Sequence, residues 1–263
     1  MASALMRFRS ALIKLVPPSM RLRKRALQAW HSSERELRLL PILCRPDATA
    51  VDVGANAGVF TYYLRKYSAR VVAFEPNPEW ARFIRAALPD VTVVEAAASD
   101  RIGEVVLRIP LGMGTEGMAT IESANSLQGL ESRSVAIPTV TLDSLNLNDV
   151  GFIKVDVEGH ELSVLQGATS TIGRDHPNIL VEAEERHRAN AVRSVADFLV
   201  AKGYRGFFLN DGAVTPIERF DASFHQNVVN LRGGAHPLYV NNFLFVFEPR
   251  TIDRLVAFNV KVD

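Results

Sequence analysis

The stretch Val51-Asp52-Val53-Gly54-Ala55-Asn56-Ala57-Gly58 decides the fold of this chain, together with the run Val71-Val72-Ala73-Phe74-Glu75-Pro76. The first predicts a buried strand, a glycine-bearing turn and then a helix, and the second predicts another buried strand that ends in a carboxylate. Gly54 and Glu75 are 21 residues apart, the length of one strand–helix–strand unit. An acidic residue about 20 residues after a glycine turn is the usual way in which an α/β fold holds a ribose. The pair therefore predicts a site for an adenosyl cofactor.

Length and composition indicate a globular protein with one large domain, or one domain with an extension. The chain has 263 residues, of which 48% are hydrophobic and 22% charged, and its net charge is +1. That charge argues against a nucleic-acid partner. The single cysteine, Cys44, excludes an internal disulfide and a zinc cluster, and we expect a cytoplasmic location. No apolar run approaches the roughly 18 residues of a membrane span.

The N-terminal region differs from the rest in charge. Residues 1–38 hold nine Lys and Arg against two acidic residues. We expect residues 1–45 to form a basic helical extension that packs on the main domain, residues 46–263. Peripheral contact with an anionic membrane surface is a second possibility, and a partner helix is a third.

Along the rest of the chain, strand-like and helix-like segments alternate, which is typical of a mainly parallel α/β sheet with helices on both faces. A helix over 19–40 is expected to end at Pro41. The glycine-rich segment 111–134 predicts a lid or binding loop. Strands are expected at 49–53, 70–75, 91–95, 104–109, 135–141, 152–155, 178–182, 205–209 and 243–247. Helices are expected at 58–67, 78–88, 160–168 and 190–202.

Ligands in such sheets bind beyond the carboxyl ends of the strands. Gly54 and Gly58 would let the backbone approach a ligand closely, and the following helix offers free N–H groups. Their spacing is Gly-x-x-x-Gly and not the Gly-x-Gly-x-x-Gly of dinucleotide binders, so it suits a methionyl carboxylate better than a pyrophosphate. Glu75 would accept hydrogen bonds from both ribose hydroxyls.

With these residues assembled, the chain resembles the FkbM family of S-adenosylmethionine-dependent methyltransferases over about residues 46–250. The matching segments are Val51–Gly58, Phe74-Glu75-Pro76-Asn77-Pro78, Thr141-Leu142-Asp143-Ser144-Leu145, Ile153-Lys154-Val155-Asp156-Val157-Glu158-Gly159-His160-Glu161 and Leu165-Gln166-Gly167-Ala168. The resemblance implies a Rossmann-like sheet of seven strands, S-adenosyl-L-methionine as cofactor, and O-methylation of a hydroxyl on a sugar, glycan or polyketide-like small molecule.

The resemblance also implies roles for individual residues. Asp156 would lie at a strand end that faces the methyl group. The residues implied to bind the cofactor are Asp52, Gly54, Ala55, Asn56 and Gly58 at the turn, Glu75 and Asn77 at the ribose, and Ala98 and Ser99, followed by Asp100, at the adenine.

A sugar hydroxyl becomes a good nucleophile only when a base takes its proton. Asp156 is the first candidate because it ends a central strand beside the glycine turn. His160 has a pKa better suited to neutral pH, and Glu158 is a third candidate, with Glu182 and His187 behind them. No metal is predicted, and magnesium on Asp156, Glu158 and Glu182 is the alternative.

Two other functions remain open at this point. One is a nicotinamide-dependent oxidoreductase, against which the missing Gly-x-Gly-x-x-Gly speaks. The other is a non-catalytic adenosyl-binding scaffold attached through the basic N-terminus. NADH binding without S-adenosylhomocysteine binding would favour the first, and tight cofactor binding without methyl transfer would favour the second.

Overall fold

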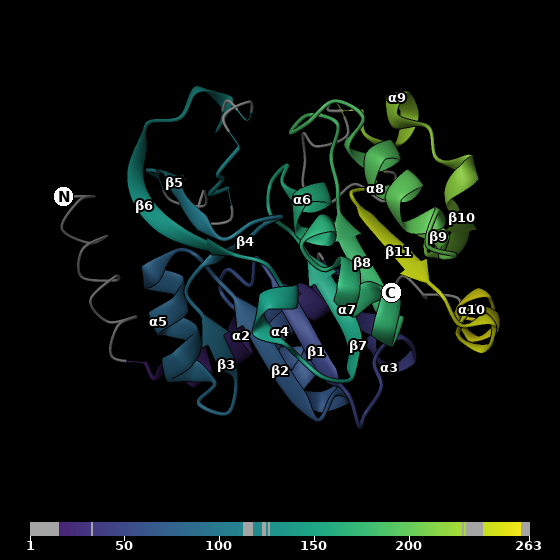
Figure 1. Ribbon diagram of the computed structural model, residues 1–263, viewed down its shortest axis with the longest axis horizontal. Helices are drawn as coiled ribbons and strands as arrows, with labels where there is room; N and C mark the ends of the chain where they lie inside the picture. The colour runs from purple at the N-terminus through teal and green to yellow at the C-terminus, as the bar shows by residue number, and fades with distance from the viewer. Residues whose placement is uncertain are drawn as a thin grey trace.

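The computed structural model describes residues 16–32, 34–112, 118–122, 125, 127–227, 229 and 239–258. Its main sheet has eight strands (Figure 1). Their order is β10 (Ala213–Pro216), β9 (Arg205–Asn210), β11 (Asn242–Val246), β8 (Asn178–Glu182), β7 (Val150–Val155), β1 (Thr49–Val53), β2 (Arg70–Phe74) and β3 (Thr92–Val94).

The five strands from β8 to β3 pair in parallel, whereas β11 runs antiparallel to both β8 and β9. The predicted mostly parallel, Rossmann-like sheet is therefore confirmed. It has one strand more than the predicted seven because the short β10 pairs with β9 at one edge.

Helices cover both faces of the sheet, as predicted. Successive side chains of a buried strand point to opposite faces, so each strand supplies two cores. Ala50 and Ala73 belong to one core, and Val51 and Phe74 to the other. The first core includes α2 (Pro18–Ser32), α3 (Leu40–Leu43), α4 (Val59–Tyr67), α5 (Pro78–Ala87) and α10 (Pro249–Val256). The second includes α6 (Glu161–Gln166), α7 (Thr169–Asp175) and α8 (Ala191–Val200).

A second, smaller sheet lies beside the main one and is made of β4 (Ala97–Ala98), β6 (Ser132–Val140) and β5 (Gly103–Pro110) (Figure 1). β5 and β6 form a long antiparallel hairpin, and Thr120 in the connection forms a bridge with Arg108. Part of the predicted loop 111–134 is thus ordered against β5, while residues 113–117 fall outside the described ranges.

Two predicted helices have different limits in the structure. The helix expected over 19–40 ends at Ser32 and is followed by the 3₁₀ helix η1 (Arg35–Leu39) and by α3. Pro41 lies in the first turn of α3, where its missing N–H costs nothing, so it does not end a helix there. The helix expected over 160–168 is α6, and α7 follows it directly. The remaining short elements are η2 (Leu127–Gly129), η3 (Asp143–Leu145), η4 (Ile217–Arg219) and α9 (Ala222–His225).

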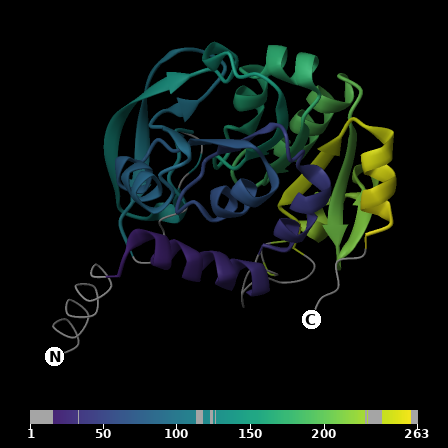
Figure 2. The same cartoon turned by 90° about the horizontal axis from the view of Figure 1, so that it is seen from below.

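Helix α2 packs along the layer formed by α4 and α5 (Figure 2). Leu22 and Ala26 are fully buried there, the Tyr63 hydroxyl donates to the Ala26 carbonyl at 3.1 Å, and Trp30 stacks on Tyr63 with 5.1 Å between ring centroids. The division into domains at residue 45 stays a prediction, and residues 1–15 lie outside the described residues. None of the helices in the described part of the chain has both the length and the apolar character needed to span a bilayer.

Candidate active site

The turn after β1 is held tightly against the ends of two neighbouring strands. Gly54 has φ +81°, and a Cβ on it would lie 1.8 Å from the backbone oxygen of Asp156 at the end of β7. The N–H groups of Gly54 and Ala55 both donate to the Phe74 carbonyl, each at 3.0 Å. Glycine is therefore required at position 54 both by the backbone conformation and by the close approach of β7.

Gly58 lies where α4 meets two neighbouring helices. It precedes α4 with φ +80°, and a Cβ on it would meet Ile84 of α5 at 3.3 Å and Leu22 of α2 at 3.7 Å. It lines neither of the two hollows described below. The residue lets α4 pack closely against its neighbouring helices, and its part in cofactor binding stays a prediction.

Glu75 follows β2 and is 5% exposed. Its carboxylate accepts the backbone N–H of Asn56 at 2.6 Å and that of Asn77 at 2.8 Å, one on each oxygen. Burial raises the pKa of Glu75 to about 7, against the lowering effect of these two N–H donors. Because each carboxylate oxygen can accept more than one hydrogen bond, both keep acceptor capacity towards the hollow that Glu75 lines.

Asn77 supports this arrangement from outside the hollow. Its N–H donates to Glu75, and its side-chain oxygen accepts the Glu79 N–H at 3.1 Å as the N-cap of α5. The structure therefore shows Asn77 as a residue that orients Glu75.

Asp52 lies in β1 beneath the glycine turn and is 1% exposed. The Thr61 hydroxyl of α4 donates to its carboxylate. Burial raises the pKa of Asp52, and the charge of Lys154 and the Thr61 hydrogen bond oppose the rise.

Asp156 and Lys154 form an ion pair at the end of β7, with 3.0 Å between Nζ and Oδ2. The Lys154 side chain is 2% exposed, and that of Asp156 is 33% exposed. Burial alone would lower the pKa of Lys154, but the carboxylates around it raise the pKa above its ordinary value. These carboxylates are Asp156, Glu182, Asp52 and Glu34, in order of effect. Lys154 therefore stays charged inside the protein, although sequence analysis gave it no role.

Two hollows meet at Gly54, Asn56 and Asp156, which line both of them. We call them the inner and the outer hollow. The inner hollow is lined by Val53, Gly54, Asn56, Phe74, Glu75, Pro76, Trp80, Ala96, Ala97, Ala98, Leu107, Ala119, Ile121, Asp156, Val157, Glu158 and His160. The outer hollow is lined by Arg25, Gln28, Ala29, Glu34, Asp52, Gly54, Ala55, Asn56, Ala57, Val59, Phe60, Lys154 and Asp156.

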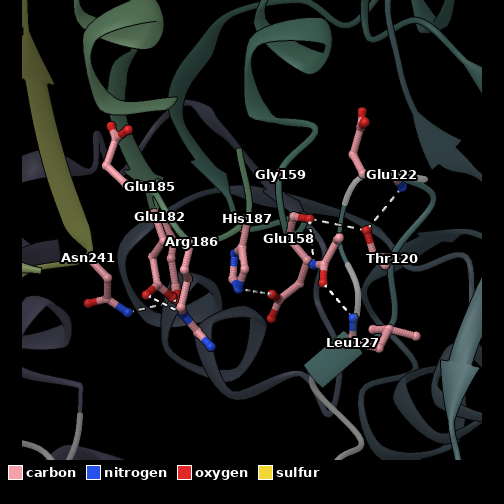
Figure 3. A network of polar contacts seen from close by, with 12 residues as sticks. Thr120, Glu122, Leu127, Glu158, Gly159, Glu182, Glu185, Arg186, His187 and Asn241 are labelled. Atoms are coloured by element: carbon pink, nitrogen blue, oxygen red, sulfur yellow. Dashed lines mark hydrogen bonds and ion pairs between the residues drawn. The ribbon is translucent and has the colours of Figure 1, made fainter. Parts of the chain in front are cut away.

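The described part of the segment between β5 and β6 helps to line the inner hollow, and a lid or binding loop there stays a prediction. Ala119 and Ile121 line the hollow, and the Thr120 hydroxyl donates to the Glu158 carbonyl at 3.1 Å (Figure 3). Asn125 donates to the same carbonyl at 3.2 Å. The described part of the segment is thus fastened to the turn after β7.

Glu158 lies in that turn with φ +55° and faces His187, with 3.0 Å between Oε2 and Nε2 (Figure 3). Burial raises the pKa of Glu158 to about 8 and lowers the pKa of His187. Both shifts favour the uncharged forms near neutral pH. Glu158 therefore lines the inner hollow, but its carboxyl group already has a partner.

His160 caps α6 and lines the inner hollow. Its Nδ1 contacts the Glu122 carboxylate, and its Nε2 lies 2.9 Å from the Ser99 hydroxyl, which donates to Asp100 at 3.1 Å. Both ring nitrogens are therefore engaged within the protein. Of the residues implied at the adenine, Ala98 lines the inner hollow, whereas Ser99 and Asp100 do not, and Ser99 contacts His160.

The magnesium alternative finds no support in this arrangement. Within the described ranges, no group of three or more His, Cys, Asp or Glu side chains is placed to hold a metal ion. Glu182 instead accepts a hydrogen bond from Asn241 at 2.8 Å (Figure 3).

The two hollows fit an adenosyl cofactor with an amino-acid tail. The inner hollow offers apolar walls and one buried carboxylate, and the outer hollow runs along the glycine turn towards α4. Where they meet, the side-chain oxygen of Asn56 is buried and has no hydrogen-bond partner among the described residues. Such an oxygen is costly without a donor, and a ligand N–H or O–H would supply one.

Comparison with known proteins gives the family. The sequence model of the methyltransferase FkbM domain matches residues 52–205. The hexuronic acid methyltransferase AglP of Haloferax volcanii is 31% identical over 147 residues, which are 52% of this chain and 56% of AglP. The AMB antimetabolite synthetase AmbE of Pseudomonas aeruginosa is 27% identical over 223 residues, 68% of this chain and 10% of AmbE. The chain thus spans little more than half of one relative and a tenth of the other.

Solved structures with a similar chain path are more distant in sequence. The FkbM methyltransferase of Methylobacillus flagellatus KT is 17% identical, with a TM-score of 0.48 over 76% of this chain and 43% of that chain. An O-methyltransferase of Bacillus cereus, solved with SAH, is 13% identical, with a TM-score of 0.45 over 88% and 90% of the two chains. Because the family match covers more than half of the sequence, the protein belongs to the methyltransferase FkbM domain family, and its cofactor is S-adenosylmethionine.

Proposed function

We propose that the protein transfers a methyl group from S-adenosylmethionine to a hydroxyl group of a sugar, a glycan or a polyketide-like small molecule. The observation that carries the proposal is the position of Asp156, which lines both hollows and keeps a third of its side chain exposed. Its carboxylate lies at the junction of the hollows and pairs with Lys154, with 3.0 Å between Nζ and Oδ2.

When bound, the sulfonium supplies an activated methyl group, so the protein mainly has to align the acceptor and remove its proton. Asp156 would accept that proton from the acceptor hydroxyl. Lys154 holds the carboxylate in place from within the sheet, at 3.0 Å. His160 and Glu158 are weaker candidates for the base because their side chains already contact Ser99, Glu122 and His187.

The described part of the connection between β5 and β6 favours a small acceptor in an enclosed site. Ala119 and Ile121 add apolar surface to the inner hollow, and exclusion of water strengthens the electrostatic interactions inside it. The name of the relative AglP points to a hexuronic acid as the methyl acceptor of that protein, which favours saccharides as the first compounds to test.

Family membership disfavours the nicotinamide-dependent alternative. The non-catalytic scaffold is disfavoured by the partly exposed Asp156, since a protein that only binds the cofactor has no need of a base beside it. A titration with NADH and with S-adenosylhomocysteine separates the first alternative from our proposal.

The test is a transfer assay with methyl-labelled S-adenosylmethionine and a panel of neutral saccharides, uronic-acid saccharides and polyketide-like hydroxyl compounds. We expect a labelled methyl ether, located on the product by mass spectrometry and NMR, and we expect Asp156→Asn to abolish it. Tight binding of S-adenosylhomocysteine without transfer to the saccharide and polyketide acceptors would contradict the proposal and favour the scaffold. A labelled methyl ester on a uronic acid would place the transfer on a carboxylate instead of a hydroxyl.

A further inference from the structure

One wall of the outer hollow comes from residues that precede the family-matched segment. Arg25, Gln28 and Ala29 of α2, with Glu34 just after it, face the turn formed by residues 54–57 across this hollow. Figure 2 shows α2 running along one side of the domain. The wall is firmly placed because Leu22 and Ala26 on the inner side of α2 are fully buried. The segment before residue 52 therefore takes part in the site.

Glu34 is the unusual member of this wall. Its backbone N–H donates to the Ala29 carbonyl at 3.0 Å, but among the described residues its carboxylate has neither a hydrogen bond nor an ion pair. Burial raises the pKa of Glu34, the charge of Lys154 lowers it and that of Asp156 raises it. Lys154 itself is engaged by Asp156 at 3.0 Å. Glu34 is half-buried and lines the outer hollow, so its carboxylate is accessible to a cation or a donor bound there.

The charges around the outer hollow match those of the cofactor tail. Asp52, Asp156 and Glu34 supply carboxylates, and Lys154 and Arg25 supply positive charges. The methionyl tail carries an ammonium group, a sulfonium and a carboxylate, so its net charge is opposite to that of this set. Among the carboxylates, Asp52 is engaged by Thr61 and Asp156 by Lys154. Among the described residues, Glu34 is the one of these three carboxylates that has no such donor, and it therefore offers its full acceptor capacity to the ammonium group.

We propose that Glu34 binds the α-ammonium group of the methionyl tail, so that the segment from α2 to Glu34 completes the methyl-donor site. The inference rests on S-adenosylmethionine being the cofactor. It adds a binding residue that lies outside the matched segment, and it gives the N-terminal segment a role in cofactor selection.

The test compares two ligands by isothermal titration calorimetry with the full chain. One is S-adenosylhomocysteine, and the other is its desamino analogue, which keeps the nucleoside and the carboxylate but lacks the ammonium group. We expect Glu34→Gln to weaken the binding of S-adenosylhomocysteine about tenfold or more, because a charge-assisted hydrogen bond is lost. The desamino analogue should bind the variant and the wild type within about twofold, since it cannot make that bond.

Glu79→Gln is the control, because Glu79 on α5 pairs with Arg133 at 2.8 Å and lines neither hollow. It should leave both affinities unchanged. Equal weakening of both ligands by Glu34→Gln would overturn the inference in favour of a structural role, and so would no weakening of either. Failure of the wild type to bind S-adenosylhomocysteine would instead refute the cofactor assignment itself.

Discussion

Replacing Glu75 by glutamine should weaken the binding of S-adenosylhomocysteine by about ten- to a hundredfold, which corresponds to roughly 1.5–3 kcal/mol. The carboxylate accepts one backbone N–H on each oxygen, from Asn56 at 2.6 Å and from Asn77 at 2.8 Å. A glutamine side chain has one oxygen, so its NH₂ group must face one of these N–H donors. The variant loses the charged acceptor for the ribose hydroxyls and also loosens the turn.

Isothermal titration calorimetry at pH 8, where Glu75 is ionised in the wild type, gives the two dissociation constants. A second ligand, 2′-deoxy-S-adenosylhomocysteine, separates the ribose contact from the loosened turn. Glu75→Gln should lower the affinity for the deoxy ligand less than the affinity for S-adenosylhomocysteine, because one of the two ribose hydroxyls that Glu75 would contact is absent. Glu79→Gln is the control, since that carboxylate lies on α5 and pairs with Arg133 at 2.8 Å on the surface.

Two results would refute this reasoning. One is a change of less than about threefold in the affinity for S-adenosylhomocysteine, since a lost charged acceptor is worth more than that. The other is an equal penalty for both ligands, which would show that Glu75 supports the turn without touching the ribose. Thermal unfolding of the ligand-free Glu75→Gln variant measures separately how much the loosened turn lowers the stability of the protein.

Four other predictions follow from the same site. Asp156→Asn should lower kcat at least about a hundredfold while the S-adenosylhomocysteine affinity, measured by calorimetry, changes only a fewfold; an unchanged kcat would exclude Asp156 as the base. Gly54→Ala should abolish cofactor binding and lower the melting temperature, because the new Cβ would lie 1.8 Å from a backbone oxygen, and wild-type affinity would contradict this. Since the pKa of Glu75 is about 7 and ribose hydroxyls favour its charged form, affinity should fall as pH falls, by about tenfold between pH 8 and pH 6, and the fall should vanish in Glu75→Gln. Met20 and Leu27 are 61% and 47% exposed on basic α2, so the protein should sediment with anionic vesicles. Replacing both residues by glutamate should reduce this binding, and equal binding of the wild type to neutral vesicles would count against a membrane contact.

The parts of the site that could be predicted are those set by local pattern and parallel topology. Gly54, Glu75 and Asp156 each end or follow a buried strand, and parallel strands bring their carboxyl ends to one edge. The alternation of strands and helices gave the sheet and its two helical layers. These features depend on residues that are close in sequence or on a rule of topology.

Contacts between distant segments could not be predicted in this way. Lys154 lies within an apolar run, and its burial is tolerated only because carboxylates from several elements surround it. His160 is held by Glu122, 38 residues away in the hairpin connection. Gly54 and Gly58 belong to one sequence pattern, but Gly54 lies against the backbone of Asp156 and Gly58 against side chains of α5 and α2, a difference that only the tertiary structure decides.

The most direct test of the account is a crystal structure of the protein with S-adenosylhomocysteine. We predict that both ribose hydroxyls lie within hydrogen-bond distance of the Glu75 carboxylate and that the methionyl tail follows the turn at Gly54 into the outer hollow. A nucleoside bound elsewhere, or a ribose held without Glu75, would contradict the account.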